Sequence, residues 1–259
     1  KTLTLEGMRI VVDCGHGASY KTTPMVLQEL GAEVIAFGTQ PNGTNINREC
    51  GSMYPQTLCA KVREYRADLG IAHDGDADRV ILCDEAGNLV DGDDIMAISA
   101  LQMLAEGRLA NKTLVATVMS NLGFERAWQA AGGLLERTAV GDQYVHAAME
   151  DLGAALGGEQ SGHSLSARHG MSGYGLLTAL QVATLIQAQG GSLADWMDGS
   201  FQPYPQKLVN VTVPDRSRRT GWEGCEPLRA AVTAAEAAMA GSGRVLVRAS
   251  GTEPLLRVM

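Results

Sequence analysis

The chain alternates short apolar runs with segments of helical pattern, and this alternation limits its possible folds more than any other feature. The apolar runs have the length of buried strands and cover 8–13, 33–37, 68–72, 80–84, 113–118, 208–213, 244–248 and a final run from 255. Helical segments lie at 22–31, 55–66, 121–131, 142–152, 175–189 and 226–240, with one more between the turn at 87–94 and residue 106. Strands that alternate with helices predict mostly parallel sheets covered on both faces.

Composition limits the size and setting of this fold. With 259 residues, 45% of them hydrophobic, the chain can bury the cores of two or three domains. Its net charge of −8 argues against a general nucleic-acid binder, so an anionic substrate would need local positive pockets. Five cysteines without a C-x-x-C pair predict free thiols in a reducing cytoplasm. We expect neither a signal peptide nor a membrane span, since no apolar run approaches the roughly 18 residues that span a bilayer, and we expect that both ends are cut.

The stretch DGDADR (74–79) carries three aspartates at alternate positions, closed by Arg79. Alternation in an extended segment would place the three carboxylates on one side. An EF-hand loop needs a glycine where Arg79 stands, and a haloacid-dehalogenase-type loop has threonine or valine where Asp78 stands, which argues against both. A site for a hard cation shared with a phosphate oxygen, or a solvated acidic turn, remains.

Two further loops carry polar groups suited to a phosphorylated sugar. GGEQSGH (157–163) offers a carboxylate, an amide and a hydroxyl that can bind sugar hydroxyls, although an ordinary polar turn has the same composition. His163 in this loop is as consistent with a structural role as with a catalytic one. RASGTEPLLR (248–257) places hydroxyls and backbone N–H groups between two arginines, as a phosphate cradle or as an incidental turn between strands. The stretch 11–20 is only a weak dinucleotide fingerprint.

In this order, DGDADR, GGEQSGH and RASGTEP resemble the metal-, sugar- and phosphate-binding loops of the α-D-phosphohexomutase superfamily. NGTNINRECGS (42–52) and VGDQYV (140–145) are most similar to its bacterial glucosamine-phosphate branch. The resemblance implies an α/β protein with successive three-layer domains of mixed, mostly parallel sheets, plus a smaller, partial C-terminal α+β domain. It places the second domain at 1–107, the third at 108–204 and a truncated fourth at 205–259. The first domain, which carries a phosphorylated serine, would be missing.

The same resemblance implies a role for each matching residue. Asp74, Asp76 and Asp78 would hold Mg²⁺, and Arg79 would contact the active-site phosphoryl group as a catalytic residue. Glu159 and Ser161 would bind the sugar hydroxyls. The phosphate that is not transferred would be bound by Arg248, Ser250, Gly251, Thr252 and Arg257. The implied reaction is a two-step phosphoryl transfer through a phosphoserine and a sugar bisphosphate.

Two positions depart from the family pattern, because Gln143 replaces an arginine and Tyr174 replaces an aspartate. The resemblance therefore leaves three functions open: a glucosamine-phosphate mutase, a phosphoglucomutase or phosphomannomutase, and a non-catalytic sugar-phosphate-binding module. The expected partners are a hexose or hexosamine phosphate, the N-terminal domain of the same protein and, for the full-length form, a second copy in a homodimer. Neither nucleic acid nor a membrane is an expected partner, and the expected location is the cytoplasm.

Overall fold

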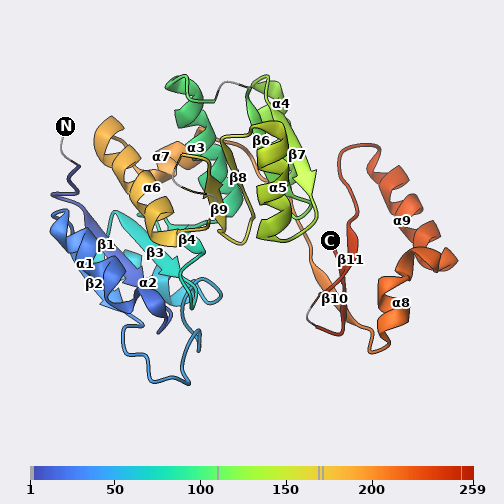
Figure 1. The fold of residues 1–259 in the computed structure, drawn as a ribbon, viewed down its shortest axis with the longest axis horizontal. Coiled ribbons are helices and arrows are strands. Elements are labelled where there is room, and N and C mark those ends of the chain that lie inside the picture. Colours follow the sequence, from blue (N-terminus) through green and yellow to red (C-terminus); the bar gives the residue numbers. More distant parts are fainter. Residues whose placement is uncertain (1–2, 110, 169, 171, 252) are drawn as a thin grey trace. The chain divides into compact units, whose positions relative to one another are not determined.

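The computed structural model describes residues 3–109, 111–168, 170, 172–251 and 253–259. They fold into two compact units, Lys1–Pro203 and Tyr204–Met259 (Figure 1). The first unit contains two β-sheets, each covered by helices, and the second contains one small β-sheet with helices.

The first sheet has the strand order β2-β1-β3-β4-β5. Its strands are β1 (Arg9–Asp13), β2 (Glu33–Phe37), β3 (Leu69–His73), β4 (Val80–Cys83) and β5 (Leu89–Val90). β1 pairs in parallel with β2 and β3, whereas β4 pairs antiparallel with both β3 and β5. The connection between β3 and β4 is therefore a short hairpin loop, and DGDADR is that loop.

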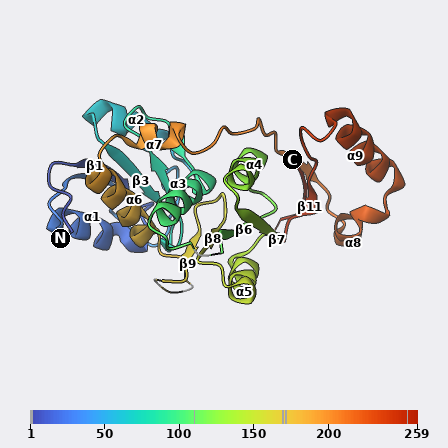
Figure 2. The same cartoon turned by 90° about the horizontal axis from the view of Figure 1, so that it is seen from above.

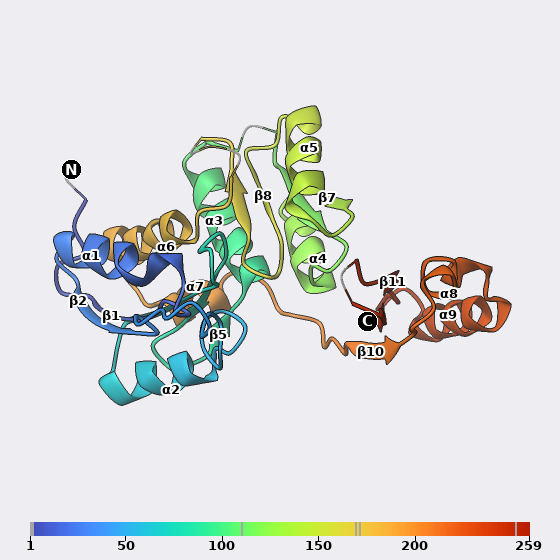
Figure 3. The same ribbon diagram turned by 60° about the horizontal axis from the view of Figure 1, so that its bottom comes forward.

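Helices cover both faces of this sheet because its central strands are apolar on both sides. α2 (Gln56–Tyr65) packs on the face formed by Val11, Ala72 and Cys83. α1 (Thr22–Glu29) and α6 (Gly175–Gln189) pack on the opposite face, and Figure 3 shows them across the sheet from α2. α6 follows the second sheet in the chain, yet its buried residues belong to the core of the first.

The second sheet has the order β7-β6-β8-β9, with β9 alone antiparallel to its neighbour. Its strands are β6 (Thr113–Thr117), β7 (Leu134–Thr138), β8 (Leu156–Gly158) and β9 (Ser164–Ser166). α3 (Gly92–Ala105) and α4 (Leu122–Ala130) pack on one face, and α5 (Asp142–Leu152) packs on the other (Figure 2). The loops that follow β6, β7 and β8 meet at one edge of the sheet, because these three strands are parallel.

Shorter elements complete both units. The first also contains a 3-10 helix, η1 (Ala18–Tyr20), and α7 (Leu193–Asp198). In the second, β12 (Leu255–Val258) lies between β10 (Val209–Thr212) and β11 (Val247–Ala249), and both pairings are antiparallel. Its helical elements are α8 (Arg216–Thr220), η2 (Trp222–Gly224) and α9 (Glu226–Met239).

The predicted fold class is confirmed: the sheets are mixed, and each of the first two has helices on both faces. The sequence did not reveal β5, β7, β8, β9, α7 or α8, which are short, or in the case of β7 carry Glu136 and Arg137 within the strand. The loop predicted at 157–163 begins only at 159, because Gly157 and Gly158 belong to β8. The domain boundaries at 107 and 204 stay predictions. No helix among the described residues is long and apolar enough to cross a bilayer.

Candidate active site

The metal loop, residues 74–79, connects β3 to β4. The loop is bent, not extended, and Ala77 has a positive φ of 63° while its N–H bonds to the carbonyl of Asp74. The aspartates therefore do not line one side of an extended segment, and DGDADR is instead the turn that the sequence predicts between the strands at 68–72 and 80–84. The carboxylates still converge, because the bend brings one oxygen from each of Asp74, Asp76 and Asp78 within 4.8 Å of the others.

Arg79 neutralises the most buried of these aspartates. Its Nε lies 2.7 Å from Asp74 Oδ2, and its backbone N–H donates to Asp74 Oδ1 at 3.1 Å. The Asp74 side chain is 1% exposed. Burial alone would raise the pKa of Asp74, but the hydrogen bonds and charge of Arg79 hold this pKa below its ordinary value. Asp74 is therefore an ionised carboxylate at neutral pH.

Asp78 lies in a different electrostatic environment. Burial, and then the negative charge of Asp74, raise its pKa to about 6. Its Oδ2 lies 3.2 Å from Nδ1 of His163, which belongs to the sugar loop. The loop thus holds more negative charge than Arg79 offsets, and a divalent cation would find oxygen ligands of the type that Mg²⁺ prefers.

The sugar loop, residues 159–163, connects β8 to β9 and is bonded directly to the metal loop. Val80 N donates to the carbonyl of Gly162 at 3.1 Å, and a β-bridge joins Arg79 to His163. The two loops come from different sheets, so this contact could not be read from the sequence. It brings the metal loop and the sugar loop into direct contact.

Within the sugar loop, Glu159 is held by its neighbours. Glu159 Oε1 accepts from the backbone N–H of Gly141 at 2.9 Å, and Oε2 accepts from the hydroxyl of Ser161 at 3.3 Å. Gly141 lies in the loop after β7, so this bond ties together two loops at the same sheet edge. Ser161 is exposed. The carboxylate and hydroxyl predicted to bind a sugar are therefore adjacent.

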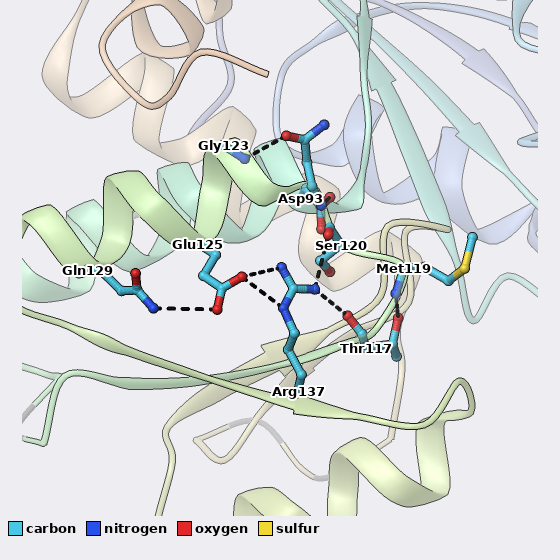
Figure 4. Close-up of polar contacts among 9 residues, drawn as sticks. Asp93, Thr117, Met119, Ser120, Gly123, Glu125, Gln129 and Arg137 are labelled. Carbon is cyan, nitrogen blue, oxygen red and sulfur yellow. Dashed lines mark hydrogen bonds and ion pairs between the residues drawn. The ribbon is translucent and has the colours of Figure 1, made fainter. Parts of the chain in front are cut away.

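The loop after β6 is held by a network that the sequence did not reveal (Figure 4). Arg137 forms a two-bonded ion pair with Glu125 at 3.0 and 2.8 Å and donates to the carbonyls of Thr117 and Ser120. Asp93, at the start of α3, accepts from the N–H of Asn121 at 2.7 Å. These bonds join the β6 loop to β7, α4 and α3. An isolated arginine in a strand gave no signal for this role.

The phosphate loop belongs to the second unit. The antiparallel register places Arg248 on β11 directly opposite Arg257 on β12, so both lie on one face of that sheet. Ser250 is buried, and its hydroxyl accepts from the N–H of Glu253 at 3.2 Å. Arg257 is ion-paired with Glu253. Gly251 is exposed, and Thr252 lies outside the described residues.

The two departures from the family pattern stand at helix starts. Gln143 is exposed in the first turn of α5, where its N–H bonds to Asp142. Tyr174 is the N-cap of α6, is 55% exposed and makes no side-chain capping bond. An aspartate there could accept hydrogen bonds from backbone N–H groups of the first helical turn, which a tyrosine ring does not do.

Three family models match nearly the whole chain. They describe α/β/α domain II of phosphoglucomutase/phosphomannomutase at residues 1–87, α/β/α domain III at 91–204 and the C-terminal domain at 208–259. These matches confirm the resemblance to the α-D-phosphohexomutase superfamily.

Curated relatives and solved structures agree with the family models. The chain is 58% identical over 255 residues to a phosphoglucosamine mutase of Synechococcus sp. (strain RCC307), covering 98% of the chain and 55% of the relative. A phosphoglucosamine mutase of Gloeothece citriformis is 54% identical over 257 residues, covering 99% of the chain and 53% of the relative. The chain thus spans about half the length of the curated relatives it matches.

Among solved structures, N-acetylphosphoglucosamine mutase of Aspergillus fumigatus, in complex with GlcNAc-6P and magnesium, shares the fold. Its TM-score is 0.79 at 22% identity, with 98% of this chain and 63% of that one covered. A phosphoglucomutase/phosphomannomutase family protein of Burkholderia thailandensis has a TM-score of 0.78 at 20% identity, with coverage of 97% and 55%.

Proposed function

Because the chain belongs to the phosphoglucomutase/phosphomannomutase family, we propose that it is the metal-, sugar- and phosphate-binding part of a phosphoglucosamine mutase. The whole protein would interconvert glucosamine 6-phosphate and glucosamine 1-phosphate through a phosphoserine and a bisphosphate intermediate. The identity of 54–58% to curated phosphoglucosamine mutases supports this branch over a phosphoglucomutase or phosphomannomutase. The cytoplasm would be the site of this activity.

One observation supports the proposal more than any other: the contact between the metal loop and the sugar loop. Val80 N lies 3.1 Å from Gly162 O, and Asp78 lies 3.2 Å from His163. A sugar hydroxyl held by Glu159 or Ser161 would therefore lie beside the aspartates. Phosphoryl transfer needs this juxtaposition, since its catalysis is mainly positioning and charge stabilisation.

Asp74, Asp76 and Asp78 would hold Mg²⁺, because their oxygens converge and their negative charge exceeds that of Arg79. The ion would stabilise the negative charge that develops on the transferred phosphoryl group. Arg79 keeps Asp74 ionised and contributes a second positive charge in the same loop. Keeping Asp74 ionised requires only the contacts between Arg79 and Asp74 within this chain.

In the second unit, the phosphate loop would bind the phosphate that is not transferred. Arg248 and Arg257 share a sheet face, and Ser250, Gly251 and Thr252 follow directly after β11. A guanidinium pair with backbone N–H groups binds a phosphate dianion well.

The phosphoserine would come from a further domain of the same protein, so we expect the isolated chain to bind but not to turn over. The test is a calorimetric titration of the chain with glucosamine 6-phosphate, glucose 6-phosphate and mannose 6-phosphate in Mg²⁺. The same titrations are made with Ser161→Ala, which lacks one hydroxyl proposed to bind the sugar. Tighter binding of the glucosamine ester, weakened in the variant, is the expected result.

Other outcomes would point elsewhere. Conversion of glucosamine 6-phosphate by the purified chain would contradict the need for a separate phosphoserine domain. Preference for the glucose or mannose ester would favour the phosphoglucomutase or phosphomannomutase alternative. Specific binding together with an upstream coding region that encodes no phosphoserine domain would favour a non-catalytic binding module.

A further inference from the structure

Gln160 stands between the two residues proposed to bind the sugar, but its side chain is engaged elsewhere. Its Nε2 donates to Asp91 Oδ2 at 3.1 Å, and its backbone carbonyl accepts from Gly92 N at 3.0 Å. The sequence suggested that this amide could bind sugar hydroxyls alongside Glu159 and Ser161. The structure gives it a different partner, at the start of α3.

Asp91 is a fixed point, because the helix holds its carboxylate in place. As the N-cap of α3, it accepts at Oδ1 from Asp93 N at 2.9 Å and from Asp94 N at 3.3 Å. The side chain of Asp94 bonds back to the N–H of Asp91 at 2.9 Å, which completes a capping box. Oδ2 of Asp91 is left for Gln160.

The contact joins two parts of the first unit. α3 follows β5, which pairs with β4, and β4 begins at Val80 directly after the metal loop. Gly92 also lies against the sugar loop, since a Cβ at this position would stand 1.9 Å from the carbonyl oxygen of Glu159. The start of α3 therefore fixes the sugar loop relative to the sheet that carries the aspartates.

Gln160 lies on a different side of the loop from its neighbours. It lines a cavity of about 290 Å³ together with Asp91 and Asn121, to which neither Glu159 nor Ser161 contributes. Glu159 instead bonds to Gly141 and to Ser161. The bond between Gln160 and Asp91 therefore determines the orientation of the sugar loop, and with it the direction in which Glu159 and Ser161 point.

We propose that Gln160 is a positioning residue, whose amide bond to Asp91 sets the orientation of Glu159 and Ser161 beside the metal loop. This inference rests on the proposed function for the identity of the sugar ligand. The hydrogen bond between Gln160 and Asp91, which we call the clamp, does not depend on that function. The clamp needs a donor at one position and an acceptor at the other, so exchanging the two groups should preserve it.

The test compares Gln160→Glu, Asp91→Asn and the double variant. Gln160→Glu places two carboxylates against each other, whereas the double variant restores an amide–carboxylate pair in the reverse direction. Asn is as good an N-cap as Asp, so the helix start is kept in Asp91→Asn. The matched control is Gln102→Glu, since Gln102 Nε2 also lies 3.1 Å from a carboxylate, that of Glu106, on the surface of α3.

Two measurements are made on each variant: amide hydrogen exchange of residues 157–163, and titration with glucosamine 6-phosphate in Mg²⁺. We expect Gln160→Glu to speed exchange in this segment and to weaken binding about tenfold or more, as for loss of a hydrogen bond to a charged group. The double variant should recover both properties, and Gln102→Glu should change neither.

The outcomes separate the two proposals. If the unaltered chain does not bind glucosamine 6-phosphate, the proposed function is wrong. Amide hydrogen exchange of residues 157–163 then tests the clamp by itself. Unchanged exchange in Gln160→Glu, or a double variant no better than Gln160→Glu, would overturn the positioning role. Altered exchange with unchanged sugar-phosphate binding would overturn it as well, because the clamp would then not orient the binding residues.

Discussion

Replacing Arg79 with glutamine tests the electrostatics of the metal loop most directly. The substitution removes the cation that lies 2.7 Å from Asp74 Oδ2 and 3.6 Å from Asp78 Oδ1. Two carboxylate oxygens 4.8 Å apart repel by about 3.5 kcal/mol at an effective dielectric of about 20. Removing one partner of a buried pair costs about 3–5 kcal/mol, and the Arg79 side chain is 33% exposed. We therefore expect Arg79→Gln to lower the free energy of unfolding by about 2–3 kcal/mol.

The assay is urea unfolding at neutral pH, in EDTA and in saturating MgCl₂. A ligand at 100 times its Kd stabilises the folded state by about 2.7 kcal/mol, so Mg²⁺ should return most of the lost stability. Mg²⁺ should stabilise Arg79→Gln more than the unaltered protein, because no guanidinium then offsets the aspartates.

The pH dependence follows from the lowered pKa of Asp74. A carboxyl whose folded pKa is depressed adds stability above its unfolded pKa, and this stability is lost as the pH falls. The difference between the two proteins should therefore shrink below about pH 4.

The control is Arg63→Gln, which removes the same charge from α2 at a site where the guanidinium bonds only to the carbonyl of Gly87 among described residues. The reasoning would be refuted if Arg79→Gln were no less stable in EDTA than Arg63→Gln. It would also be refuted if Mg²⁺ gave both variants the same gain in stability.

Three further changes test other parts of the first unit. Tyr174→Asp should raise the free energy of unfolding by about 1 kcal/mol in urea titrations by supplying the missing cap of α6, and an unchanged value would contradict this. Burial, together with the charge of Asp91, raises the pKa of Asp94 to about 8, so the folded carboxyl keeps a proton that the unfolded chain releases near its ordinary pKa of 3.8. Stability therefore falls as pH rises towards 8. Asp94→Asn should raise the melting temperature more at pH 8 than at pH 5, and an equal gain at both pH values would contradict the raised pKa of Asp94. Gly92→Ala should speed hydrogen exchange at 157–163, since its Cβ would overlap the carbonyl of Glu159, and unchanged exchange would show that the close approach is not required.

The sequence determined the elements with strong local signals. β2, β6 and α6 lie at or within one residue of their predicted ranges, because each is a long periodic or continuous apolar segment between clear turn residues. β9 has three residues, and β7 has charged side chains within it, so neither gave a pattern that differs from a loop. The family resemblance of the three loops was also visible locally, since each loop is a contiguous run of residues.

Tertiary structure decided what these residues touch. The sequence placed Asp78 and His163 in separate motifs 85 positions apart, and only the packing of the two sheets brings them to 3.2 Å. It grouped Gln160 with the sugar-binding side chains, whereas the fold turns its amide to Asp91. It placed the helix at 175–189 within the third domain, at 108–204, whereas the buried residues of α6 pack in the core of the first sheet. A local pattern fixes the conformation of a segment, but a side chain's partner depends on which distant segment supplies the complementary group, and that is settled only when the cores pack.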